Sequence, residues 1–183
     1  MTLVTAYILL GVIFVVAGLA LVSGSQPVSS MLRAFPRSMG AAVVLFGGGA
    51  VWFLWIVSQL GESDLAGFPR NWMLGIFGVT ALLSFKYLRD LLAVRGLAVV
   101  MLLSARALLD IGYMKLPYSF VLACTCYILV VLGIWWGAAP YVFRNWSTWA
   151  LEKRPRTLAI GTIILVIGIA NLAAACFAPS SAT

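Results

Sequence analysis

The chain contains no histidine, and only five of its 183 residues are acidic. Histidine is the usual axial ligand of haem, the commonest zinc ligand and a frequent general base, so the most common forms of that chemistry are excluded. A metal-dependent or hydrolytic site would need several carboxylates to converge. Here they are scattered along the chain, at Glu62, Asp64, Asp90, Asp110 and Glu152. We therefore expect no catalytic residues, no metal site and no cofactor.

Cysteine and phosphate-binding motifs are also sparse. Cys124 and Cys126 are two residues apart, so on a helix they point roughly 200° apart and cannot form a disulfide with each other. The Cys-x-x-Cys motif of thiol oxidoreductases is absent. We expect all three cysteines, including Cys176, to be buried small apolar residues. The run FGGGA at 46–50 lacks the lysine and hydroxyl residue of a nucleotide-binding loop, and we expect a flexible or kinked point there instead.

Charge is scarce and apolar sequence is abundant. Charged residues make up 9% of the chain, against about 25% in soluble domains, and hydrophobic residues make up 63%. The apolar segments are residues 3–22, 39–60, 72–85 (extended to Tyr87), 91–111, 117–136 and 157–177. A helix of about 20 residues crosses the hydrocarbon core of a bilayer. We predict an all-α integral membrane protein with one domain, 1–183, and six transmembrane helices in a compact bundle with short loops.

The first apolar segment has two interpretations, a cleaved signal peptide or a retained anchor. No basic region precedes it, and it is long for a signal peptide, so we expect an anchor. Orientation follows from the basic residues, which the cytoplasmic side of a membrane retains. Under six spans, one side carries Arg33, Arg37, Lys86, Arg89, Arg95, Arg144, Lys153, Arg154 and Arg156, while the other carries Arg70 and Lys115. This predicts a bacterial inner-membrane protein with both termini outside.

Three related motifs precede apolar segments: FPRS at 35–38, FPRN at 68–71 and RPRT at 154–157. Proline disfavours helix at the residue before it, and a following polar side chain accepts a hydrogen bond from a free amide of the first turn. We expect Ser38, Asn71 and Thr157 to cap the helices that follow them.

Small residues recur at a spacing of seven within the apolar segments. Glycine allows close approach of helix backbones where lipid provides no hydrophobic driving force for association. The predicted helix-packing residues are Gly11 and Gly18, Gly40 and Gly47, Gly161 and Gly168, together with Gly133 and Gly137 at a spacing of four. Packing within this chain is the expected role, and oligomer contacts or a groove for a ligand are the alternatives.

Residues 140–156 combine aromatic and basic side chains. The aromatic residues are Tyr141, Phe143, Trp146 and Trp149, and the basic ones are Arg144, Lys153, Arg154 and Arg156. Aromatic rings prefer the level of the lipid headgroups, and cations there attract anionic lipid at about 1 kcal/mol each. We expect this segment to lie along the inner membrane surface. The net charge of +7 then reflects topology and lipid contact, not nucleic-acid binding.

The candidate polar site lies in segment 91–111. Arg106 and Asp110 are four residues apart, so they share a helix face and are able to form an ion pair. In one interpretation this pair and Ser104 face neighbouring helices and hold the helix in register. In the other, Arg106 lines an outward-opening cavity for an anionic group, or Asp110 relays protons. Asn171 is a further intramembrane polar residue that belongs to the candidate site.

The sequence favours a non-catalytic membrane protein, a structural or accessory subunit that packs with itself or with other membrane subunits. The alternative is a small-solute transporter or substrate-binding membrane component. In length and helix count the chain resembles the substrate-capturing components of energy-coupling-factor transporters, although the predicted outside termini are opposite to that family's. A lipid or quinone enzyme would require Arg106, Asp110 and Tyr113 to act together.

Overall fold

The computed structural model describes residues 2–61, 69–88, 91–113, 115 and 117–178, and this part of the chain is helical without strands. The α-helices are α1 (Leu3–Ser23), α2 (Gln26–Ala34), α3 (Met39–Ala42), α4 (Gly48–Gln59), α5 (Arg70–Tyr87), α6 (Leu92–Gly112), α7 (Phe120–Ala138), α8 (Pro140–Glu152) and α9 (Arg154–Phe177). A 3₁₀ turn, η1 (Phe35–Arg37), precedes α3, and a π-helical turn, η2 (Val43–Gly47), joins α3 to α4.

Five of the described helical segments are long and apolar enough to cross a membrane. They are Leu3–Ser23, Met39–Gln59, Leu92–Gly112, Phe120–Ala138 and Arg154–Phe177. The remaining predicted segment, 72–85, lies in α5, which has 18 residues. Its ends carry Arg70, Asn71 and Lys86, which lower its mean hydropathy. The structure therefore supports a membrane protein with five clear candidate spans.

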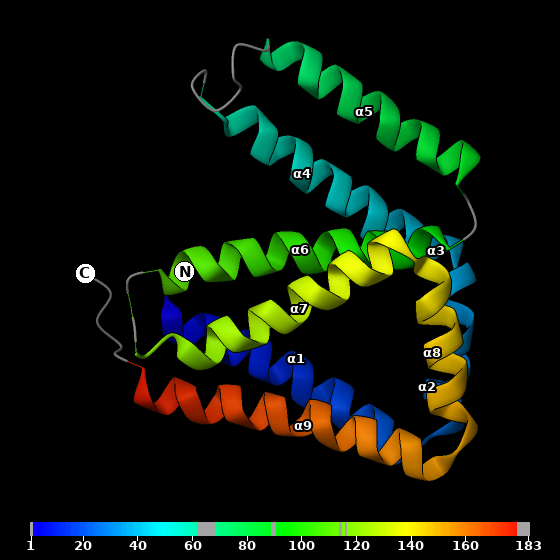
Figure 1. Cartoon of the computed structure of the whole chain (residues 1–183), viewed down its shortest axis with the longest axis vertical. Helices are drawn as coiled ribbons and strands as arrows, with labels where there is room; N and C mark the ends of the chain where they lie inside the picture. The colour runs from blue at the N-terminus through cyan, green and yellow to red at the C-terminus, as the bar shows by residue number, and fades with distance from the viewer. Residues whose placement is uncertain (1, 62–68, 89–90, 114, 116, 179–183) are drawn as a thin grey trace.

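Two antiparallel helix pairs form the bundle (Figure 1). α1 packs along α9, and α6 packs along α7. The pairs meet in an apolar cluster that includes Leu10 of α1 and Leu108 of α6. Beside it, the buried Tyr7 hydroxyl donates a hydrogen bond to the Tyr118 carbonyl at 2.7 Å and accepts one from the Leu122 amide at 3.2 Å. These contacts join α1 to the start of α7.

The two pairs converge near the chain termini and diverge toward the other end (Figure 1). There α2 and α8 lie side by side across the bundle. The prediction of short loops is wrong at these two connections, because each contains a helix. Both helices begin at or beside a proline, Pro27 in α2 and Pro140 in α8, and proline is favourable in a first turn.

The hairpin of α4 and α5 leans away from α6 (Figure 1). Its base is held where Gly96 of α6 lies against the backbone of Phe46 in η2. α4 and α5 contact each other through the rings of Phe53 and Phe77, whose centroids are 5.0 Å apart. The π-helical turn ends at Gly47, within the glycine run where the sequence predicted a flexible or kinked point. The hairpin departs from the bundle beyond this turn.

One of the three predicted helix caps is confirmed. Ser38 accepts a hydrogen bond from the Ala41 amide at 3.2 Å. The prediction for Asn71 is wrong, because α5 begins one residue earlier and Pro69 is its N-cap. The prediction for Thr157 is also wrong, because α9 begins at Arg154. Thr157 lies inside the helix, and its hydroxyl donates to the Ala150 carbonyl at 2.8 Å.

The cysteines form no disulfide with one another in the described part of the chain. Only Cys126 is buried, so the expectation of three buried cysteines is wrong for the other two. Cys124 and Cys176 are exposed on the outer surfaces of α7 and α9. An apolar helix in a membrane protein faces lipid as well as core, so apolar sequence alone does not predict burial inside the protein.

Candidate functional site

The two charged residues of the predicted site lie on the surface of α6. Arg106 and Asp110 are both exposed, and no hydrogen bond or ion pair joins them. Among the residues that the structure describes, an ion pair forms instead between Arg156 and Glu152, with 3.1 Å between Nη1 and Oε2. The Arg106–Asp110 ion pair that the spacing permits is therefore absent. Of the two interpretations, the one in which this pair faces neighbouring helices of the chain is wrong.

The course of α4 explains this exposure. Val99 of α6 contacts Gly49 of α4, with 3.0 Å between its Cγ1 atom and the position of an added Cβ. Residues seven or eleven positions apart return to nearly the same face of a helix, so Arg106 and Asp110 continue the face that Val99 begins. Along this part of α6, toward its C-terminal end, α4 has diverged from it (Figure 1). Arg106 and Asp110 therefore lie on the face of α6 that the diverging α4–α5 hairpin leaves uncovered.

A second uncovered surface lies on α5, on the face away from the Phe53–Phe77 contact with α4. An added Cβ at Gly75 or at Gly78 would meet no atom within 4 Å. Gly75 lies in a shallow groove between Trp72 and Val79, and both of these side chains are exposed. α5 packs against α4 and has no other neighbour with comparable contact among the described elements. We call these two uncovered surfaces together, Gly75 and Gly78 of α5 and Arg106, Asp110 and Tyr113 of α6, the open side of the bundle.

An apolar cavity of about 240 Å³ lies within the base of the hairpin, between α4, α5 and α6. Its wall includes Phe53, Phe77 and Val99. Since side chains of α4, α5 and α6 all line this cavity without filling it, the hairpin is loosely packed against the bundle.

The other three members of the predicted site lie in different surroundings. Asn171 is fully buried, and its Nδ2 atom donates to the Thr125 hydroxyl at 3.0 Å and to the Ile167 carbonyl at 2.8 Å. Its Oδ1 atom has no hydrogen-bond partner. Asn171 therefore joins α9 to α7 and does not reach Arg106. Ser104 is half-buried on α6, and Tyr113 is 73% exposed just after that helix ends.

Four of the predicted packing glycines form the contact between α1 and α9. An added Cβ would lie 2.6 Å from Leu172 at Gly11, 2.7 Å from the Leu165 amide nitrogen at Gly18, 2.9 Å from Val22 at Gly161, and 2.7 Å from the Val15 amide nitrogen at Gly168. Real Cβ atoms do not approach this closely, so an added side chain would displace a neighbour at each position, and at Gly18 and Gly168 that neighbour is the backbone of the other helix. This contact is the most extensive helix pairing among the described elements.

The remaining packing glycines differ from one another. Gly133 of α7 fits against Leu102 at 3.1 Å, whereas Gly137 and Gly47 leave room for a Cβ at ordinary contact distance. Gly40 has only the hydroxyl of Ser38 within 4.0 Å, so it contacts no neighbouring helix. Sequence reasoning missed Gly96, whose Cβ would collide with the backbone of Phe46. It belongs to no seven-residue series.

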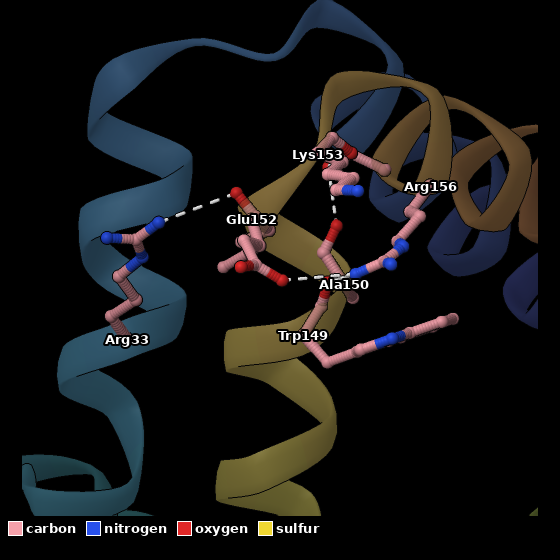
Figure 2. A network of polar contacts seen from close by, with 8 residues as sticks. Arg33, Trp149, Ala150, Glu152, Lys153 and Arg156 are labelled. Carbon is pink, nitrogen blue, oxygen red and sulfur yellow. Dashed lines mark hydrogen bonds and ion pairs between the residues drawn. The ribbon is translucent and has the colours of Figure 1, made fainter.

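Residues 140–156, which the sequence predicted to lie along the membrane surface, form α8 and the start of α9. The exposed residues are Tyr141, Arg144, Trp146, Trp149, Lys153 and Arg154. The Arg156 guanidinium lies over the Trp149 ring at 4.5 Å while pairing with Glu152 (Figure 2). Phe143 differs, because it is 5% exposed and packs edge-on against Trp136 at 4.8 Å.

The basic residues are distributed unequally between the two ends of the bundle. Arg33 in α2, Lys86 at the end of α5 and Arg95 at the start of α6 lie toward the same end as α8. Arg70, at the start of α5, and Lys115, between α6 and α7, lie toward the opposite end (Figure 1). Arg89 and Asp90, and Glu62 and Asp64 of the other connection, fall outside the described residues.

Comparison with protein-family models, with curated proteins and with solved structures gives no match for this chain. Within the described residues, no three His, Cys, Asp or Glu side chains lie close enough together to hold a metal ion. The open side, the buried Asn171–Thr125 bond and the basic end are therefore the features from which a function must be inferred.

Proposed function

We propose that this chain is a non-catalytic, six-span protein of the bacterial inner membrane, and that its open side packs against transmembrane helices of a partner chain. It would serve as a structural or accessory subunit, in a complex or in a homo-oligomer. The observation that carries the proposal is the hairpin of α4 and α5, which is supported from one direction and leaves the charged face of α6 uncovered.

A sixth span is supported by the length and direction of α5. Its 18 residues correspond to about 27 Å of helix, close to the ~30 Å of the hydrocarbon core. It returns antiparallel to α4, so its polar ends lie at the two ends of the bundle (Figure 1). Long side chains such as Arg70 and Lys86 reach the interface from these positions. With the basic end inside, both termini lie outside.

The need for a partner follows from the charges on α6. Arg106 is six residues before the end of the helix, about 9 Å along its axis. A charged residue facing lipid costs about 2.5–3.5 kcal/mol at the centre of a span, and less toward the ends. Polar groups of a partner helix would remove that cost. Gly75 and Gly78 would allow the same partner to approach α5 closely.

Mass measurement after extraction in a mild detergent or in native nanodiscs tests this function. We expect the wild-type chain to migrate with a second copy or with other membrane subunits. Replacing both Gly75 and Gly78 by Leu should dissociate this assembly, since an added side chain occupies the space that a partner needs. The matched control is Ala170→Leu on the exposed surface of α9, on the opposite side of the bundle (Figure 1), and it should leave the assembly intact.

A wild-type chain recovered alone from native nanodiscs would contradict the proposal. If that lone chain retained a small solute, the carrier alternative would replace it. An assembly that Ala170→Leu disrupts as strongly as the glycine variant would place the contact elsewhere.

A further inference from the structure

A second apolar cavity lies where the two helix pairs diverge. Its volume is about 440 Å³, within the ~300–1,000 Å³ typical of ligand pockets. Its walls come from α1, α2, α6, α7, α8 and α9, and include Ala20, Met31, Leu97, Trp136 and Ile164. The accessible lining is almost wholly apolar. An unfilled apolar space forgoes dispersion contacts that an apolar ligand would restore. We call this second cavity, between the two helix pairs, the apolar cavity.

A smaller pocket of about 190 Å³ adjoins the apolar cavity, and half of its accessible lining is polar. It contains Arg33, Arg154 and Ser29, and we call it the arginine pocket. The two spaces share Leu21, Val28, Leu151 and Thr157 as wall residues. Together they form one amphipathic site, whose cationic part lies among the end of α1, α2, the end of α8 and the start of α9.

The two arginines are held in place by weak contacts. Figure 2 shows Arg33 of α2 extending to the last turn of α8, where its Nη2 atom lies 3.4 Å from the Leu151 carbonyl oxygen. The Nη2 atom of Arg154 lies 3.4 Å from the Val22 carbonyl oxygen. Neither arginine has a carboxylate partner among the described residues, because Glu152 is paired with Arg156. Both guanidinium groups are therefore available to form an ion pair with a bound anion.

The chain makes room for Arg154 at Gly24. Gly24 ends α1 with a φ of 60°, which favours glycine, and an added Cβ would collide with the Arg154 guanidinium. The absence of a side chain at Gly24 thus leaves room for this guanidinium in the arginine pocket.

We infer that this site binds one anionic phospholipid. One acyl chain fills the apolar cavity, and the phosphate lies in the arginine pocket between Arg33 and Arg154. Guanidinium groups suit a phosphate because they donate hydrogen bonds in pairs. The inference differs from general attraction of anionic lipid to a basic surface, because it assigns one lipid to a defined cavity. It also does not depend on a protein partner.

Native mass spectrometry of the purified full-length chain tests this inference. The protein is exchanged into detergent containing phosphatidylglycerol or phosphatidylcholine with identical acyl chains. We expect one phosphatidylglycerol to remain bound per chain, about tenfold or more in preference to phosphatidylcholine, because its headgroup has a net negative charge, whereas the choline cation of phosphatidylcholine offsets its phosphate and is repelled by the two guanidinium groups. Equal retention of the two lipids would overturn the inference.

Variants separate the two parts of the site. Arg33→Gln combined with Arg154→Gln should reduce retention of phosphatidylglycerol about tenfold or more. Arg144→Gln removes an exposed arginine of α8 that lines neither space, and it should have little effect. Ala20→Phe should reduce retention by occupying the apolar cavity, whereas Ala170→Phe should not. Equal losses in the Arg144 control and the double variant would indicate surface attraction alone.

The wild-type protein provides a test that does not rely on the variants folding. Excess glycerol 3-phosphate carries the headgroup charge without a tail, and we expect it not to displace bound phosphatidylglycerol. Lysophosphatidic acid, which has one acyl chain, should displace it. Displacement by glycerol 3-phosphate would show that the site recognises a free phosphate and would overturn the assignment of the apolar cavity to a tail.

Discussion

At the scale of single residues, polar side chains in this protein follow one of two patterns. Some bond to another helix inside the bundle, as Asn171 does with Thr125. Others bond within their own helix, as the exposed Thr80 does with the Ile76 carbonyl, or remain unpaired on the surface, as Arg106 does. The first pattern stabilises the chain, and the second leaves groups available to other molecules.

Thr125→Val should lower the free energy of unfolding by about 0.5–1.5 kcal/mol. The substitution keeps the shape of the side chain and removes the acceptor for the buried Asn171 amide, and interhelical hydrogen bonds in membranes contribute about this much. The measurement is a denaturant titration in micelles. Thr80→Val is the control, since that exposed hydroxyl bonds only within α5, and it should change stability by less than about 0.5 kcal/mol.

Arg106→Leu should leave the stability of the isolated chain within about 0.5 kcal/mol of the wild type, because the side chain is exposed and has no ion pair. The same substitution should weaken the assembly of the proposed partner interface, as seen by mass after mild extraction. A large loss of stability in the isolated chain would show that Arg106 supports the fold of α6.

At the scale of elements, the helix pairs differ in how they are held. Close backbone contacts at glycines hold α1 against α9, while the rings of Phe53 and Phe77 hold α4 against α5. A glycine contact depends on distances that a single methyl group would violate. Contacts through flexible side chains adapt more readily, so the α4–α5 hairpin should tolerate substitution better than the α1–α9 pair.

Gly168→Ala should destabilise the chain by about 1–3 kcal/mol, since the new methyl group would lie 2.7 Å from the Val15 amide nitrogen and must force α1 and α9 apart. Gly48→Ala is the matched control, because no atom lies within 4 Å of its added Cβ. It should be neutral or stabilising by up to about 1 kcal/mol through helix propensity. The thermal unfolding midpoint in detergent ranks the two variants. Equal midpoints would contradict the close contact.

At the scale of the whole molecule, the two ends of the bundle differ in kind. The end with both termini is closed by apolar packing around Tyr7. The other end is wider, carries most of the basic residues and is covered by α2 and α8 (Figure 1). Helices with exposed aromatic and basic residues that lie across a bundle suit the headgroup level, so this end is where the chain would meet charged lipid.

Reporter fusions measure the topology of the whole chain. A reporter active only outside the cytoplasm should work after Leu60 and after Phe177, and it should be inactive after Tyr87 and after Ala138. The two fusions after Leu60 and after Tyr87 decide whether α5 crosses the membrane, because a non-spanning α5 would place both reporters on the same side. Fluorescent fusions that mature only in the cytoplasm should give the opposite pattern at each site.

The sequence by itself determined the class and the positions of the apolar helices, because their lengths and compositions are local properties that the bilayer requires. Spacing of seven was enough to identify the glycines of the α1–α9 contact. It wrongly included Gly40 and missed Gly96, since periodicity identifies a face and not the neighbour that meets it.

Only the tertiary structure decided what each polar residue contacts. The spacing of Arg106 and Asp110 permitted an ion pair, which is not formed, and the departure of α4 at η2 leaves their face of α6 uncovered. The amphipathic site required Arg33 and Arg154, which are far apart in the sequence, to meet where two helix pairs diverge. Such meetings depend on the paths of whole helices, and a local pattern contains no information about those paths.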